Sequence, residues 1–195
     1  MKLFSLFLLL ASAALTTAKT PPTLGLSLWM SASTGDATLL KNNLAQDASS
    51  LNVRGSGGQT PLMAACLHGH AECVLLLLEA GADPNIGEDQ GYTCLHGAGF
   101  QGRASVIRAI ASSRFSEIVP NNAHEDGFSP VHRACWGRET RHSEALAAFF
   151  ETGVPVNLLS KSNETPQMMV EKKKYRPSLD VIKQFEKKTV IDTEL

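Results

Sequence analysis

Aromatic residues, cysteines and net charge are all scarce in this sequence. Aromatics make up 6% of the 195 residues, there are four cysteines, and the formal net charge is −1. A single sandwich or barrel core would usually use more aromatics, and a near-neutral chain is poorly suited to non-specific nucleic-acid binding. Hydrophobic residues account for 43% of the chain, which excludes general disorder. We therefore expect one folded domain and no nucleic-acid partner.

Long apolar runs are also absent after residue 20, where nothing approaches the ~20 apolar residues that span a bilayer. The first 18 residues differ, because Met1-Lys2 is followed by an apolar run from Leu3 and by small residues up to Ala18. This pattern predicts a secretory signal peptide at residues 1–18. We expect cleavage, entry into the secretory pathway as a secreted or endoplasmic-reticulum protein, and no stable membrane span afterwards. An uncleaved anchor is the alternative.

A repeated pattern fills most of the remaining chain. Residues 58–90 contain a Gly-Gln-Thr-Pro turn, a short helical stretch that ends at Gly69, a longer apolar stretch that ends at Gly81, and an extended return. A unit of this kind cannot bury its own apolar face, so it requires copies on either side. The turn residue recurs at intervals of 33, 36 and 36 residues, at Thr60, Thr93, Ser129 and Thr165.

These motifs, with Asn85 before the turn and Gly69 and Gly81 after the two helices, resemble the ankyrin repeat. The resemblance implies an all-α ankyrin-repeat solenoid of helix-turn-helix units joined by β-turn or hairpin loops. We expect four to five repeats in a domain at 24–188, followed by a flexible tail at 189–195. The predicted units are about 24–57, 58–90, 91–126, 127–162 and 163–188.

The third unit departs most from the pattern. It has Cys94 where other units have Pro, and it places Gly97 and Gly99 inside its first helix. Each glycine costs about 1 kcal/mol of helix propensity relative to Ala. The third unit also has three extra residues near 112–118, and the fourth unit has three extra residues near 138–143, between its two helices.

The resemblance to ankyrin repeats implies a concave face made of turn tips and first helices. We select the candidate partner-binding residues from the positions that this resemblance places on that face. Large apolar residues recur in these columns, and exposed aromatic clusters are typical binding hot spots. We expect Arg133 to be exposed there and to add a charge-assisted contact. Acidic tips at Glu88-Asp89 and Glu125-Asp126 favour a partner with some basic character. The candidates are Leu67, His68, Tyr92, Phe100, Gln101, Phe128, Arg133 and Trp136. The alternative is that the extra loops or the N-terminal segment cover these rings.

The sequence thus predicts a monomeric, non-enzymatic module without a cofactor that binds an unidentified protein partner. One alternative is a metal-binding or enzymatic protein that uses the Cys66, His68, His70 and Cys73 cluster. That cluster lacks the paired ligand spacing typical of zinc sites. Another alternative is a structural protein without a specific partner. By the resemblance, His96 and His132 are expected to make hydrogen bonds within the turns.

The cysteines and one sequon complete the candidate sites. Cys66 and Cys135 lie two units apart, about 20 Å if units stack at helix-packing distance, too far for a bridge. A Cys66–Cys94 or Cys66–Cys73 bridge stays open, but we favour buried free thiols. Asn163 begins an Asn-Glu-Thr sequon and is the candidate glycosylation site.

Overall fold

The structure is a computed structural model that describes residues 24–46, 49–118 and 123–193. The predicted signal peptide at 1–18 lies outside these residues. Within them the chain is all helical and contains no strand. The α-helices are α1 (Leu24–Thr34), α2 (Ala37–Gln46), α3 (Pro61–His68), α4 (Ala71–Glu79), α5 (Cys94–Gln101), α6 (Ala104–Ala111), α7 (Pro130–Ala134), α8 (Thr140–Glu151), α9 (Pro166–Lys173) and α10 (Arg176–Thr193). Short 3-10 turns occur at η1 (Ser56–Gly58) and η2 (Ser116–Ile118).

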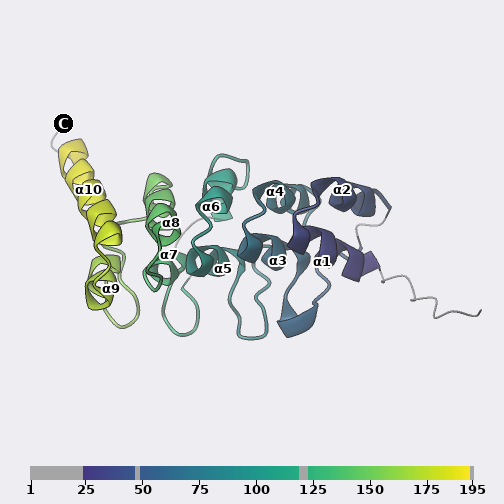
Figure 1. Ribbon diagram of the computed structural model, residues 1–195, viewed down its shortest axis with the longest axis horizontal. Coiled ribbons are helices and arrows are strands. Elements are labelled where there is room, and N and C mark those ends of the chain that lie inside the picture. Colours follow the sequence, from purple (N-terminus) through teal and green to yellow (C-terminus); the bar gives the residue numbers. More distant parts are fainter. Residues whose placement is uncertain (1–23, 47–48, 119–122, 194–195) are drawn as a thin grey trace, which may run out of the picture.

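The helices form two parallel rows (Figure 1). The first helices of the units (α1, α3, α5, α7 and α9) lie in one row, and the second helices (α2, α4, α6, α8 and α10) lie in the other. Each helix packs on the next one in its own row and on its partner within the unit. The loops between units project beyond the row of first helices (Figure 1). This arrangement is the all-α repeat solenoid that the sequence predicts.

The turn residues begin the first helices. Thr60 and Thr165 accept hydrogen bonds from the backbone N–H groups three residues later, at 3.2 and 3.3 Å. Such capping satisfies a backbone donor that the helix itself leaves free, and loss of a cap costs about 1 kcal/mol. Pro61 and Pro166 follow at the first helical position, where a missing N–H group does no harm.

The core lies between the two rows and runs the length of the stack. Leu62 of α3, Leu77 of α4, Ile107 of α6 and Phe149 of α8 are all fully buried, as is Ile182 of α10. Burial of each such side chain contributes about 1.5–3 kcal/mol. The last helix, α10, packs on α8 and α9 and continues to Thr193, past the predicted domain end at residue 188.

The structure corrects the preference for free thiols at Cys66 and Cys94. These residues form a disulfide with a Cα–Cα distance of 5.4 Å, which joins α3 to α5 in the neighbouring unit. The bridge is possible because Cys94 occupies the helix-start position that other units give to Pro, directly against α3. A bridge closing 28 residues stabilises by about 3.5 kcal/mol in the chain-entropy model. Cys73 and Cys135 are free and buried, as predicted.

The two glycines of α5 lie against different neighbours. A Cβ atom on Gly99 would lie 2.3 Å from the backbone oxygen of Pro130, so only glycine lets α5 and α7 approach this closely. A Cβ atom on Gly97 would instead lie 2.9 Å from the end of the Leu67 side chain. The first conflict involves rigid backbone and the second a movable side chain.

We therefore predict different effects on stability for two alanine substitutions that gain equal helix propensity. Gly99→Ala should lower the free energy of unfolding by about 1–3 kcal/mol, because the α5–α7 contact must open. Gly97→Ala should stay within about 1 kcal/mol of the native value, because the propensity gain offsets a small shift of Leu67. Urea denaturation of the two variants measures the difference. Equal stabilities would mean that close α5–α7 packing is not what requires Gly99.

Candidate functional site

The first helices of three consecutive units, and the turn tips before α3 and α5, line an open groove of about 390 Å³. We call it the aromatic groove. Its helix end is apolar and is formed by Met63, Leu67, Phe100 and Trp136. Its tip end is polar and is formed by Gln59, Glu88, Gln90 and Tyr92. His96, Gly97 and Arg133 lie between the two ends.

Three of the apolar residues come from equivalent positions at the ends of α3, α5 and α7. The Phe100 and Trp136 rings meet edge to face with centroids 6.4 Å apart, and Phe128 meets Trp136 in the same way at 5.6 Å. Phe100 is 49% exposed, whereas Trp136 is only partly exposed. Part of this ring cluster therefore faces solvent, and part supports the structure.

Neither extra loop covers these rings in the described residues. The turn η2, in the extra stretch near 112–118, packs on α6 in the outer row. The extra residues at 138–143 lead into α8, which begins at Thr140. The alternative that these loops cover Phe100 is thus wrong, because that residue stays 49% exposed. The N-terminal segment that the same alternative named lies outside the described residues at 1–23.

Arg133 is not exposed, which corrects the prediction from sequence. Its residue is 4% exposed, and its guanidinium carbon lies 4.4 Å from the Tyr92 ring centroid and 4.1 Å from that of Trp136. Its Nη2 donates to Asp126 in an ion pair. A buried cation needs such partners, since an unpaired charge would be costly in this environment. Arg133 therefore lies between the Tyr92 and Trp136 rings as a structural support, and it is too buried to form an ion pair with a partner.

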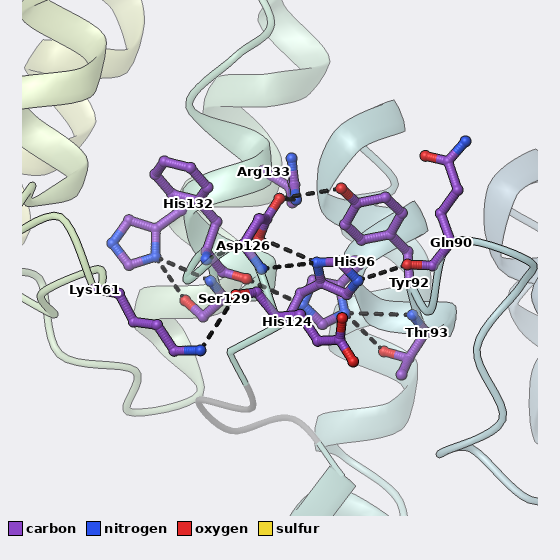
Figure 2. Close-up of polar contacts among 12 residues, drawn as sticks. Gln90, Tyr92, Thr93, His96, His124, Asp126, Ser129, His132, Arg133 and Lys161 are labelled. Carbon is purple, nitrogen blue, oxygen red and sulfur yellow. Dashed lines mark hydrogen bonds and ion pairs between the residues drawn. The ribbon is translucent and has the colours of Figure 1, made fainter.

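Asp126 links the groove wall to the neighbouring turn tip (Figure 2). Its Oδ2 accepts from the Tyr92 hydroxyl at 3.0 Å, and its Oδ1 accepts from the backbone N–H of Phe128 at 3.1 Å. Burial alone would raise the pKa of Asp126, but hydrogen bonds from the backbone N–H of Phe128, from Arg133 and from Tyr92 lower it to about 2. The carboxylate therefore stays charged across the physiological pH range.

His124 extends the same connection from one tip to the next. Its Nε2 donates to the backbone oxygen of Gln90 at 2.6 Å, and its Nδ1 accepts from the backbone N–H of Asp126 at 3.3 Å (Figure 2). The His124 ring also packs on the Tyr92 ring with centroids 4.0 Å apart. The tip that carries Tyr92 is thereby fixed to the following unit.

His96 and His132 make the turn hydrogen bonds that the resemblance implies. His96 Nδ1 accepts from the Thr93 hydroxyl at 2.9 Å, and His96 Nε2 donates to the Phe128 carbonyl at 3.3 Å. His132 repeats this pattern with Ser129 at 2.8 Å (Figure 2) and with the Leu158 carbonyl at 3.1 Å. Burial lowers the pKa of His96 to about 4 and lowers that of His132 as well. Both rings are therefore neutral at pH 7 and join successive units.

A second set of hydrogen bonds fixes the helix ends that carry the groove residues. Arg103 Nε donates to the Leu67 carbonyl at 2.8 Å, and His142 Nε2 donates to the Phe100 carbonyl at 3.1 Å. His70 Nε2 makes the equivalent bond to Ser33 at 3.1 Å in the preceding unit. The last carbonyls of a helix lack intrahelical partners, so each bond satisfies an otherwise free acceptor. Sequence reasoning missed this set because the donor changes between His and Arg.

The structure brings together five of the eight candidate residues in the groove, namely Leu67, Tyr92, Phe100, Arg133 and Trp136. Phe128 supports the wall through Trp136 and Arg133. His68 and Gln101 do not line the groove, and His68 stacks on His70 instead. Met63 and Gly97 also line the groove but were not predicted to, because Met63 occupies an ordinary helix-packing position and Gly97 stood out only as an irregularity of the helix.

The metal-binding alternative loses its proposed ligands. The Cys66 sulfur is bonded to Cys94, and burial raises the pKa of the Cys73 thiol. His70 donates to the Ser33 carbonyl through Nε2. Across residues 24–46, 49–118 and 123–193, no group of three or more His, Cys, Asp or Glu side chains could hold a metal ion.

The helices of these same residues include none with the length and apolar character needed to span a membrane.

Comparison with known proteins agrees with this geometry. Residues 28–122 match the family model for ankyrin repeats in three copies. Together with the stacked helix pairs, this match defines the class of fold: the chain forms an all-α ankyrin-repeat solenoid.

The similar proteins have diverse names. The chain is 35% identical over 96 residues to the serine/threonine-protein kinase TNNI3K of Rattus norvegicus, covering 44% of this chain and 12% of the kinase. It is 31% identical over 105 residues to the putative E3 ubiquitin-protein ligase XBAT31 of Arabidopsis thaliana, covering 49% and 22%. It is 37% identical over 92 residues to the ANK repeat-containing protein nipk-1 of Caenorhabditis elegans, covering 46% and 15%. The chain thus spans about a fifth or less of these relatives, so the likeness concerns the repeats alone.

The lowered histidine pKa values predict that mild acid destabilises the fold. His96 binds a proton near pH 6.5 when unfolded but only near pH 4 when folded, so stability is full above pH 6.5 and falls toward pH 4. His96 alone should cost about 2 kcal/mol at pH 5, and His132 acts in the same direction. Urea denaturation at pH 7.5 and pH 5.0 measures the loss.

Two histidine variants serve as controls. His68→Gln should keep the full pH dependence, because His68 is exposed and takes no part in these bonds. His96→Gln should be less stable at pH 7.5 but should show a shallower decline toward pH 5.0. Identical stability of the native protein at both pH values would contradict the assignment of neutral, buried histidines.

Proposed function

We propose that this protein is a non-enzymatic interaction module that binds a protein partner through the aromatic groove. The observation that carries the proposal is the exposure of Phe100, whose side chain is 49% exposed while its ring meets Trp136 edge to face in the groove. Large exposed apolar groups at the middle of a fixed, partly polar surface are typical of binding hot spots. Ankyrin repeats commonly mediate protein–protein interaction, which supports the same function.

The groove is also held in one shape before any partner binds. The Cys66–Cys94 bridge fixes α3 to α5, and the Asp126 and His124 contacts fix the Tyr92 tip. A preorganised surface loses little conformational entropy on binding, so the apolar contacts retain more of their favourable free energy. This rigidity supports a recognition role over a purely structural one.

We further propose that the protein acts in the secretory pathway. Three observations support this location: the signal-peptide pattern at residues 1–18, the Cys66–Cys94 disulfide and the Asn163 sequon. Disulfides persist mainly in oxidising compartments. Asn163 is exposed in a turn with φ 58°, a left-handed conformation that Asn tolerates better than most residues, so a glycan there would meet no packed neighbour.

The binding proposal predicts that Phe100→Ala abolishes partner capture while the fold stays stable. Loss of a hot-spot ring costs about 2 kcal/mol or more, which lowers affinity at least about 30-fold. The exposed ring contributes little to the core, so the melting temperature should change by no more than a few degrees. Immobilised protein should be incubated with the secretory fraction of its source cells, and captured proteins should be quantified by mass spectrometry.

Leu39→Ala is the matched control, because Leu39 is 45% exposed but lies on α2 in the outer row. This variant should capture the same proteins as the native chain. The binding proposal fails if all three forms capture the same set, or if the native protein captures nothing specifically. Trp136→Ala is a less clean variant, because Trp136 also contacts Arg133.

The location proposal predicts that the mature protein begins after Ala18 and carries a glycan on Asn163. Mass spectrometry of protein recovered from its source should show the shortened N-terminus and an intact Cys66–Cys94 bridge. Glycosidase treatment should reduce the mass of the native protein but not that of Asn163→Gln. A mature chain that retains Met1 with a reduced Cys66 thiol would contradict the secretory assignment.

A further inference from the structure

We infer that the aromatic groove selects an extended peptide segment in which a bulky apolar side chain lies within three residues of a lysine or arginine. This inference rests on the proposed function and specifies the chemistry of the partner. Charge, size and spacing each contribute one part of it.

The charge expected of the partner follows from which carboxylates at the turn tips form no ion pair. Four acidic residues occupy the turn tips, but Asp89 pairs with Arg54 at 3.0 Å and Asp126 pairs with Arg133. Glu88 and Glu125 form no ion pair within the described residues. Of these two, only Glu88 lines the groove.

Among the described residues, Arg133 is the one cation that lines the groove, and it does not offset Glu88, because Asp126 already neutralises its guanidinium and rings enclose it. The described part of the groove therefore presents a single uncompensated negative charge at its tip end. A lysine or arginine of the partner would supply the missing countercharge, whereas an acidic segment would be repelled.

The apolar requirement follows from the helix end of the groove. Leu67, Phe100, Met63 and Trp136 offer carbon surfaces and no charge there. The volume of about 390 Å³ accommodates a large aliphatic or aromatic side chain together with neighbouring peptide backbone. Gly97 keeps this space open, because a Cβ atom there would lie 3.3 Å from the Met63 methyl carbon and 2.9 Å from Leu67.

The spacing follows from the geometry of α5. Glu88 Oε1 lies 3.4 Å from the backbone nitrogen of Tyr92, next to the helix cap Thr93, so the Glu88 carboxylate marks the start of α5. Phe100 lies seven residues after Thr93 at the helix end, a rise of about 10 Å. An extended peptide covers about 3.3 Å per residue, so three residues match that length. A long basic side chain can shorten the interval to two residues.

Two glutamines complete the recognition surface. Gln59 and Gln90 line the tip end, and their side-chain amides make no hydrogen bond within the part of the chain that the structure describes. Each amide carries both a donor and an acceptor, the combination that pairs with the backbone of an extended segment. The segment would thus bind by its backbone and cation at the tips and by its apolar side chain at the helix ends.

The test is a selection from a phage-displayed random peptide library on the purified full chain with its disulfide intact. We expect enrichment of peptides with Leu, Ile, Phe, Met or Trp followed or preceded within three residues by Lys or Arg. One enriched peptide is then synthesised, together with a version in which its basic residue is Gln. Fluorescence anisotropy measures the affinity of both peptides.

Two glutamine variants isolate the role of Glu88. Glu88→Gln should weaken the basic peptide about fivefold and remove most of the salt dependence of binding, because the ion pair is lost. It should leave the affinity of the Gln-containing peptide unchanged. Glu125→Gln removes a similarly unpaired carboxylate from the next tip and should alter neither peptide. The substitution keeps an acceptor for the Tyr92 backbone N–H, which Glu88 Oε1 now contacts at 3.4 Å.

The outcomes separate this inference from the proposed function. Enriched apolar peptides without a basic bias, or equal effects of Glu88→Gln and Glu125→Gln, would overturn the charge preference while the groove remained a binding site. Peptides that bind the native protein and Phe100→Ala equally, or no enrichment at all, would overturn both.

Discussion

The spacing between successive units is the constraint on which the rest of the structure depends. No helix pair buries its own apolar face, so both stability and surface shape arise at the contacts between units. At the centre of the stack this spacing is fixed from two sides of α5. The Cys66–Cys94 bridge sets its distance from α3, and the contact between Gly99 and Pro130 sets its distance from α7. The groove is the outer surface of these two interfaces.

The ion pair between Arg133 and Asp126 determines how little net charge the groove displays. Arg133 and Asp126 carry opposite charges on neighbouring units, and their pairing offsets both charges in the electrostatics that a partner would encounter. The same Asp126 orients the Tyr92 hydroxyl, and the same Arg133 separates Tyr92 from Trp136. Two charged side chains thus act as structural supports for an aromatic wall. Specificity then depends on the few polar groups that remain free, chiefly Glu88, Gln59 and Gln90.

Periodicity in the sequence was sufficient to predict the solenoid and most of the aromatic cluster. Tyr92, Phe100 and Trp136 could be identified because each unit places equivalent residues at equivalent positions. Arg133 was misjudged because its column is solvent-facing in a regular unit, and only three-dimensional neighbours show that Tyr92 and Trp136 enclose it. The disulfide was likewise left open, since a one-dimensional pattern does not give the distance between Cys66 and Cys94. The spacing of residues in the sequence predicts which face of the stack a side chain occupies. It does not predict whether neighbouring side chains on that face bury it or bond to it.

The departures from the repeat pattern in the third unit now have a common location. Cys94 replaces a helix-starting proline and forms the bridge to α3, Gly97 leaves space on the groove floor, and Gly99 permits contact with α7. The two glycines together cost about 2 kcal/mol of helix propensity. A bridge of about 3.5 kcal/mol in the same helix is large enough to offset that cost. This irregular helix is therefore also covalently joined to its neighbour, and its irregularities shape the surface that we propose binds the partner.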